Sequence, residues 1–158
     1  MSRTASERRS PAALPASSPV RPPIISHTLR AVAIEGANLI PVARMTNGIA
    51  TQPRSVLALL VYHYAVGIFA SREIESALWK DAQFRALCHD DFPDWRQLRR
   101  FRRLNHEAVR KCLMHVLAAQ SHTESRDEHA TMDSQHWFAE ADRRLTAAIW
   151  IDDLLADA

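Results

Sequence analysis

Five arginines stand within eight residues of this 158-residue chain: Arg96, Arg99, Arg100, Arg102 and Arg103. A planar guanidinium donates two parallel hydrogen bonds, so arginine suits a phosphate group or the edge of a guanine base. The net charge of the whole chain is only +2 and gives no sign of this local cluster. The cluster therefore predicts contact with nucleic acid.

The arginine cluster is expected to lie on one face of a helix. Asp94 suits the N-cap of a helix that continues to about Leu104. Trp95, Leu98, Phe101 and Leu104 recur every three residues and are expected to face the core. The candidate DNA-binding residues are the polar remainder: Arg96, Gln97, Arg99, Arg100, Arg102 and Arg103. An alternative stays open, in which the basic face pairs with the acidic C-terminal segment of the same chain.

The elements before this helix predict a helix-turn-helix unit. Two short helices are expected over 71–80 and 82–87, the first capped by the hydroxyl of Ser71, with a turn at 88–93. In such a unit the last helix enters the major groove of DNA. Upstream, Pro53 suits the first turn of a helix that runs to about Phe69 and is apolar on nearly every face. This pattern predicts a central, enclosed helix.

Two further helices are expected after the arginine helix. Asn105 suits the cap of a helix that runs to Gln120, with an apolar stripe of Val109, Cys112, Leu113, Val116 and Leu117. Residues 121–133 are polar and weakly patterned, which predicts a linker. An amphipathic C-terminal helix is expected over 134–158, with its apolar face interrupted by Asp152.

The N-terminal region divides into two parts. Residues 1–23 hold five of the eight prolines and almost no large apolar side chains, which predicts a disordered tail. Residues 24–46 are rich in β-branched and aliphatic residues, and two short strands, an extended arm or a short helix would each fit. The expected fold is mainly α, with a compact multi-helix domain over 24–120.

Composition excludes several classes of protein. Three glycines are too few for the glycine-rich loops of nucleotide-binding proteins. The most apolar stretch, residues 56–70, is shorter than the roughly 20 residues that span a bilayer. The two cysteines predict reduced thiols in a cytoplasmic protein. Cys88 with His89, and Cys112 with His115, could offer zinc ligands, but buried thiols fit better, and we expect no metal, cofactor, membrane or small-molecule partner.

Four motifs occur in order along residues 53–118. They are Pro-Arg-x-x-Leu-Ala-Leu-Leu-x-Tyr from position 53, Gly-Ile-Phe-x-Ser-Arg-Glu-Ile-Glu from 67, Asp-x-x-Phe-Arg from 81, and Pro-Asp-x-x-x-Leu-x-x-Phe-Arg-Arg from 93. This segment resembles the N-terminal (InsH-like) domain of DDE-type insertion-sequence transposases. The resemblance implies a helical domain that holds the DNA at transposon ends. In such enzymes a separate ribonuclease H-like domain cuts and joins the strands with three carboxylates and two Mg²⁺ ions.

The chain departs from that pattern after residue 118. The first catalytic aspartate of the family normally follows in an apolar strand beside a glycine, but Gly67 is the last glycine here. We therefore expect the catalytic domain to be missing, with Asp133 as a helix cap and not a metal ligand. The expected function is binding of duplex DNA without catalysis, and a second copy or a full-length transposase would be the protein partner. The alternatives are a helical protein-interaction module or a decaying transposase fragment without activity.

Overall fold

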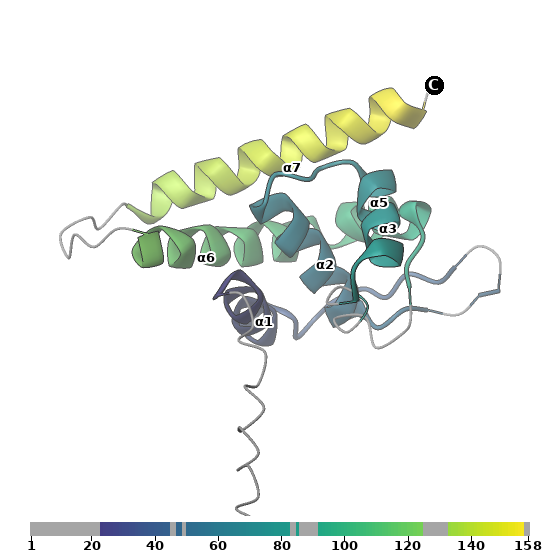
Figure 1. The fold of residues 1–158 in the computed structure, drawn as a ribbon, viewed down its shortest axis with the longest axis horizontal. Helices are drawn as coiled ribbons and strands as arrows, with labels where there is room; N and C mark the ends of the chain where they lie inside the picture. Colours follow the sequence, from purple (N-terminus) through teal and green to yellow (C-terminus); the bar gives the residue numbers. More distant parts are fainter. Residues whose placement is uncertain are drawn as a thin grey trace, which may run out of the picture.

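A computed structural model describes residues 23–44, 47–48, 50–82, 85, 92–124 and 133–156. The described residues form the helices α1 (Pro23–Glu35), α2 (Pro53–Ala65), α3 (Ser71–Lys80), α5 (Trp95–Leu104), α6 (His106–Glu124) and α7 (Ser134–Ala156) (Figure 1). Within these ranges the only β contact is an isolated antiparallel bridge between Ala43 and Ala50. The expected mainly α fold is confirmed. The tail predicted at 1–23 lies outside the described residues except for Pro23, which begins α1.

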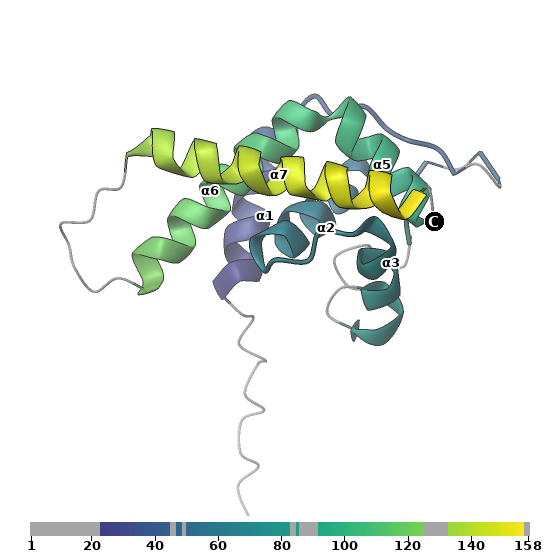
Figure 2. The same ribbon diagram turned by 90° about the horizontal axis from the view of Figure 1, so that it is seen from above.

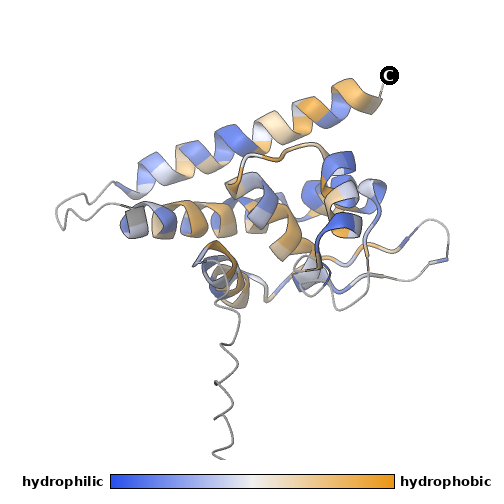
Figure 3. Ribbon diagram, in the orientation of Figure 1, coloured by the Kyte–Doolittle hydropathy of each residue, from blue (hydrophilic) through white to orange (hydrophobic). Residues whose placement is uncertain are grey.

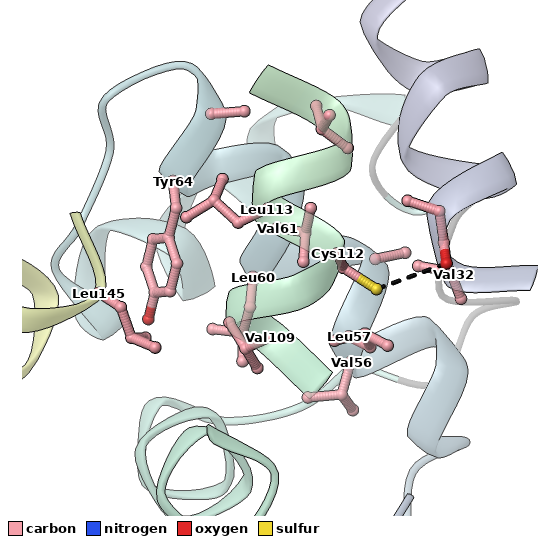
Figure 4. Packing of buried hydrophobic residues seen from close by; sticks show 14 of the residues in the cluster. Val32, Val56, Leu57, Leu60, Val61, Tyr64, Val109, Cys112, Leu113 and Leu145 are labelled. Carbon is pink, nitrogen blue, oxygen red and sulfur yellow. Dashed lines mark hydrogen bonds between the residues drawn. The ribbon is translucent and has the colours of Figure 1, made fainter. Parts of the chain in front are cut away.

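The core is built around α2, as its apolar composition predicts. Its side chains from Ser55 to Val61 are buried, together with His63, Tyr64 and Ala65. α1 and α6 pack against it and add apolar side chains. The ribbon of both helices is partly orange, the colour of apolar residues, in Figure 3. α7 crosses α6, as the view from above shows (Figure 2), and adds Ala141, Leu145 and Ala148 to the same core. In Figure 4 the ring of Tyr64 lies beside Leu145.

The end of α2 differs from the prediction. The sequence pattern predicts a helix to about Phe69, but α2 ends at Ala65. Gly67 adopts a φ of 88°, a left-handed conformation that glycine reaches without strain. The amide of Ile68 donates back to the carbonyl of His63 at 2.8 Å and closes the last turn. The chain thereby turns sharply into α3.

Residues 23–35 form a helix, so the strand prediction for this part of 24–46 is wrong and the short-helix alternative is correct. Ile25, Thr28 and Val32 are buried at helical spacing, and the Thr28 hydroxyl donates to the Ile24 carbonyl at 2.8 Å. Burial of this face outweighs the weak preference of β-branched residues for strands.

An extended segment follows α1 and is held by one side chain. Asn105 Oδ1 accepts from the Ile40 amide at 2.7 Å, and its Nδ2 donates to the Ile40 carbonyl at 3.0 Å. The side chain of Asn105 therefore fixes this segment and does not cap α6, contrary to the prediction. The extended-arm alternative is correct for residues 39–44, and residues 45–46 lie outside the described part of the chain.

α7 is fastened to the end of α2 by Arg144. Its guanidinium donates to the carbonyls of Tyr64 and Ala65 at 2.9 and 2.8 Å, where a helix ends with unpaired acceptors. Glu140 binds both Arg143 and Arg144, and their hydrogen bonds lower the pKa of Glu140 to about 2. The polar start of α7 is thereby fixed on the core.

The boundaries between the last helices also differ from the prediction. α6 continues to Glu124, so residues 121–124 are helical and not part of a linker. Residues 125–132 lie outside the described part of the chain. Asp133 Oδ1 accepts from the Gln135 amide at 3.2 Å, which agrees with the predicted cap of α7. None of the described helices is long and apolar enough to cross a membrane.

Candidate nucleic-acid interface

The start of α5 is fixed by a capping box. Asp94 Oδ1 accepts from the Gln97 amide at 2.8 Å, and Gln97 Oε1 accepts from the Asp94 amide at 3.1 Å. Gln97 Nε2 also donates to the carbonyl of Val42 at 3.1 Å. The predicted cap is confirmed, but Gln97 is only 3% exposed. The prediction that Gln97 points outward to DNA is therefore wrong, because the cap turns its side chain toward the core.

The buried face of α5 is rotated from the predicted one. Its buried residues are Gln97, Leu98, Phe101 and Arg102. An α-helix turns about 100° per residue, so three steps of three residues place Leu104 on the side opposite Trp95. Accordingly Trp95 is half-buried and Leu104 is 41% exposed. The predicted core face of Trp95, Leu98, Phe101 and Leu104 is correct only for the two middle residues.

Arg102 is almost completely buried in an ion pair. Its Nη1 donates to Asp152 Oδ2 at 2.8 Å and to the Tyr64 hydroxyl at 3.0 Å. The side chains of Arg102 and Asp152 are 4% and 3% exposed. Burial opposes the charged form of Arg102, but the contacts with Tyr64 and Asp152 outweigh it and raise its pKa. Arg102 therefore has no free donor surface for DNA, contrary to the prediction.

Asp152 joins α7 to α3 as well as to α5. Its Oδ1 accepts from the amide of Ser71 at 2.8 Å, and its Oδ2 accepts from the Ser71 hydroxyl. A carboxylate at this end of α3 also complements the positive end of the helix dipole. Ala70 is the N-cap of α3, so Ser71 does not cap the helix with its hydroxyl, contrary to the prediction. Asp152, the residue that interrupts the apolar face of α7, thus binds this helix to α3 and α5.

The other arginines of α5 line a groove against the C-terminal half of α7. Arg96, Arg100 and Arg103 are exposed, and Arg99 is partly buried. The groove has a volume of about 640 Å³ and is lined by Trp95, Arg96, Arg99, Arg100, Arg102, Arg103, His106, Ile149 and Asp153. Both ribbon views show the end of α7 beside α5 (Figures 1 and 2). Five of the six predicted site residues therefore line this groove, and four of them, all but Arg102, are exposed or partly exposed.

The indole of Trp95 organises three guanidiniums at the start of this surface. Arg72, Arg96 and Arg99 lie over its ring, with their central carbons 4.7, 4.6 and 5.8 Å from the ring centroid. Such cation–π contacts restrict the arginines while leaving their donors available. Arg72 comes from α3 and extends the basic surface beyond α5. Sequence reasoning missed it as a site residue, although it stands in the Ser-Arg-Glu motif that opens α3.

The family of the chain is shown by a sequence comparison. The model of the family described as Transposase domain (DUF772) matches residues 26–104, half of the chain. The chain belongs to this transposase-domain family. No curated protein and no solved structure matches the chain. The matched part of this transposase domain contains α5 with all five clustered arginines, whereas α6 and α7 lie beyond it.

Of the two cysteines that sequence reasoning considered as zinc ligands, the described one, Cys112, has a structural role. Cys112 is fully buried, its thiol donates to the Ala31 carbonyl at 3.5 Å, and burial raises its pKa to about 12. A neutral, buried thiol of this kind is a core residue, since metals bind the thiolate. Cys88 and His89 lie outside the described residues. Within the described ranges no three histidine, cysteine or acidic side chains gather as a metal site.

Proposed function

We propose that this transposase-domain protein binds duplex DNA through the groove between α5 and α7. The observation that carries the proposal is the set of guanidiniums directed to one surface: Arg72, Arg96, Arg99, Arg100 and Arg103. Arginine forks match phosphate oxygens in pairs, and phosphate contacts supply most of the affinity of proteins for DNA. Membership of a transposase family supports the same partner.

The arginines of the groove are expected to contact two different parts of the DNA, the bases and the sugar-phosphate backbone. Arg96 and Arg99 or Arg100 lie nearer the start of α5, the end of a recognition helix where base contacts usually fall. Arg103, one turn further along, is expected to contact the sugar-phosphate backbone. α3 and α5, the first and last helices of the proposed helix-turn-helix unit, pack together. Most of the short helix expected over 82–87 and of the turn expected over 88–93 lies outside the described residues.

The proposed role is binding without strand cutting or joining. Three described carboxylates around the groove already serve as caps or ion-pair partners: Asp94 caps α5, Asp152 pairs with Arg102, and Asp153 pairs with Arg99. Two-metal nucleases need clustered carboxylates that are free to hold Mg²⁺. Because the proposed partner is DNA, we also propose that the protein acts in the cytoplasm.

A second role, as a protein-interaction module, is favoured by exposed apolar side chains near the C-terminus. Trp150 and Leu154 are 66% and 54% exposed and stand one turn apart on α7. The corresponding end of α7 in Figure 3 is orange with blue between the orange parts. A surface of this kind fits a protein better than DNA. In this reading the pairing of α7 with α5 would cover the arginines, and charge removal in the groove would leave DNA affinity unchanged.

The proposal is tested by removing three exposed charges from the groove. The triple variant Arg96→Ala, Arg100→Ala, Arg103→Ala should bind a short duplex much more weakly than the unchanged protein. The slope of log affinity against log salt should also fall by about one, since Arg103 is the backbone contact among the three and each lost phosphate contact lowers the slope by about 0.9. Fluorescence anisotropy at several salt concentrations measures both quantities.

The matched control removes three charges elsewhere. Arg30, Lys80 and Lys111 are exposed on α1, α3 and α6, outside the groove. The variant with alanine at these three positions has the same net charge as the groove variant, so the loss of general attraction to DNA is similar. We expect its salt slope to stay close to that of the unchanged protein. Equal losses in the two variants, with helicity retained, would contradict binding through the groove.

A further inference from the structure

One carboxylate lies inside the arginine groove. Asp153 is the only acidic residue among the described residues that line it. Its Oδ1 accepts a hydrogen bond from Arg99 Nη2 at 2.9 Å. The side chain of Asp153 is 63% exposed and that of Arg99 is 26% exposed. The pair therefore faces the solvent-filled groove and is not part of the core.

The neighbouring aspartate keeps Asp153 in this place. Asp152 is buried, and its contacts with Arg102 and Ser71 fix the C-terminal half of α7 against α5 and α3. A buried pair is screened much less by salt than an exposed one. Asp153 is the next residue along the same turn, so the contacts of Asp152 also hold Asp153 beside the groove.

A carboxylate and a phosphate offer a guanidinium the same kind of charged oxygen acceptor. Arg99 also lies over the ring of Trp95 and lines the groove together with Ile149 and Asp153 of α7. The place where a phosphate oxygen would bind Arg99 is thus filled by an oxygen of the chain itself. An exposed ion pair is weak, so a phosphate surrounded by several arginines can replace it.

We propose that Arg99 is a phosphate-binding position whose acceptor in the free protein is Asp153, and that DNA must displace this carboxylate in order to bind. The inference rests on the proposed DNA-binding function and adds to it a built-in competitor. Asp153 lowers the affinity of the groove for every duplex, and it reduces the salt dependence because Arg99 is already neutralised before DNA arrives.

The test compares two neutral variants of α7. Asp153→Asn keeps the size of the side chain and removes its charge. Asp142→Asn makes the same change of net charge at an aspartate that is 49% exposed, 3.6 Å from Arg110 and outside the groove. We expect Asp153→Asn to bind a short duplex about 2- to 5-fold more tightly than Asp142→Asn, the range of an exposed ion pair. Its salt slope should be steeper by about one.

A double-mutant cycle shows whether Asp153 acts through Arg99. In an Arg99→Ala background, the advantage of Asp153→Asn over Asp142→Asn should disappear. Persistence of the advantage in that background, or equal affinities of the two single variants, would overturn the inference. Asp153→Ser serves as a second neutral variant, and circular dichroism verifies that each variant keeps its helices.

The outcomes also separate this inference from the proposed function. If the unchanged protein binds duplex through the groove arginines but Asp153→Asn behaves like Asp142→Asn, only the competitor role of Asp153 is wrong. If neither the unchanged protein nor Asp153→Asn binds duplex at low salt, both the proposed function and the inference are wrong.

Discussion

At the residue scale, two adjacent aspartates have different roles because their surroundings differ. Asp152 is 3% exposed and compensates the buried charge of Arg102, whereas Asp153 is exposed in the groove. The sequence places both in an acidic C-terminal segment, but only Asp152 falls on the apolar face of the expected helix. The signal that was available is the position of Asp152 on the apolar face of its helix, since a buried carboxylate needs a charged or hydrogen-bonding partner.

Removal of the buried carboxylate should be far more damaging than removal of the exposed one. Asp152→Ala leaves Arg102 buried without its ionic partner, and we expect the free energy of unfolding to fall by about 3–5 kcal/mol. Asp153→Ala, the control, should cost less than about 1 kcal/mol. Urea-induced unfolding followed by circular dichroism measures both. A loss below about 1 kcal/mol in Asp152→Ala would contradict the anchoring role of Asp152.

At the element scale, local signals predict helix starts better than helix faces. Asp94 caps α5 as its residue type predicts, because a cap depends on neighbours three residues away. The face of α5 that is buried depends on α2, α3 and α7, which lie far away in the sequence. The three-residue spacing from Trp95 to Leu104 predicted the wrong face because it drifts by half a turn over the helix.

α2 contains a buried histidine that makes stability depend on pH. Burial lowers the pKa of His63, although its hydrogen bond to the Leu59 carbonyl and the charge of Asp81 act in the opposite direction. The unfolded chain takes up this proton near pH 6.5, while the folded chain takes it up only at lower pH. The free energy of unfolding should therefore fall as the pH decreases from about 7 to about 5.

The contribution of His63 is isolated by a substitution that does not titrate. In His63→Gln, the decrease of the melting temperature between about pH 7 and about pH 5 should be smaller than in the unchanged protein. The comparison uses the change with pH, so a constant loss of stability in the variant does not affect it. Identical pH dependence in the two proteins would show that His63 is not the responsible group.

At the scale of the whole molecule, α7 completes both the core and the candidate site. It lies beyond the matched transposase segment, yet it packs Leu145 into the common core and provides Asp153 to the groove. The sequence predicted the core helices α2, α6 and α7 and the basic character of α5, whereas it left α1 open between a helix, strands and an extended arm. It could not predict that Arg102 and Gln97 are buried, because this depends on α7 and on the extended segment near Val42. Because of that packing, Gln97 and Arg102 are not part of the exposed DNA-binding surface that the sequence predicts.

The most direct test of the central claim follows each arginine separately while duplex DNA is added. The Nε–Hε resonances of arginine side chains report local contacts by nuclear magnetic resonance. Titration with a short duplex should shift the signals of Arg96, Arg99, Arg100 and Arg103, and added salt should reverse the shifts. The signal of buried Arg102 and that of Arg30 on α1 should stay in place. Shifts at Arg30 without any at the four groove arginines, in a protein that remains helical, would contradict binding of DNA by the α5–α7 groove.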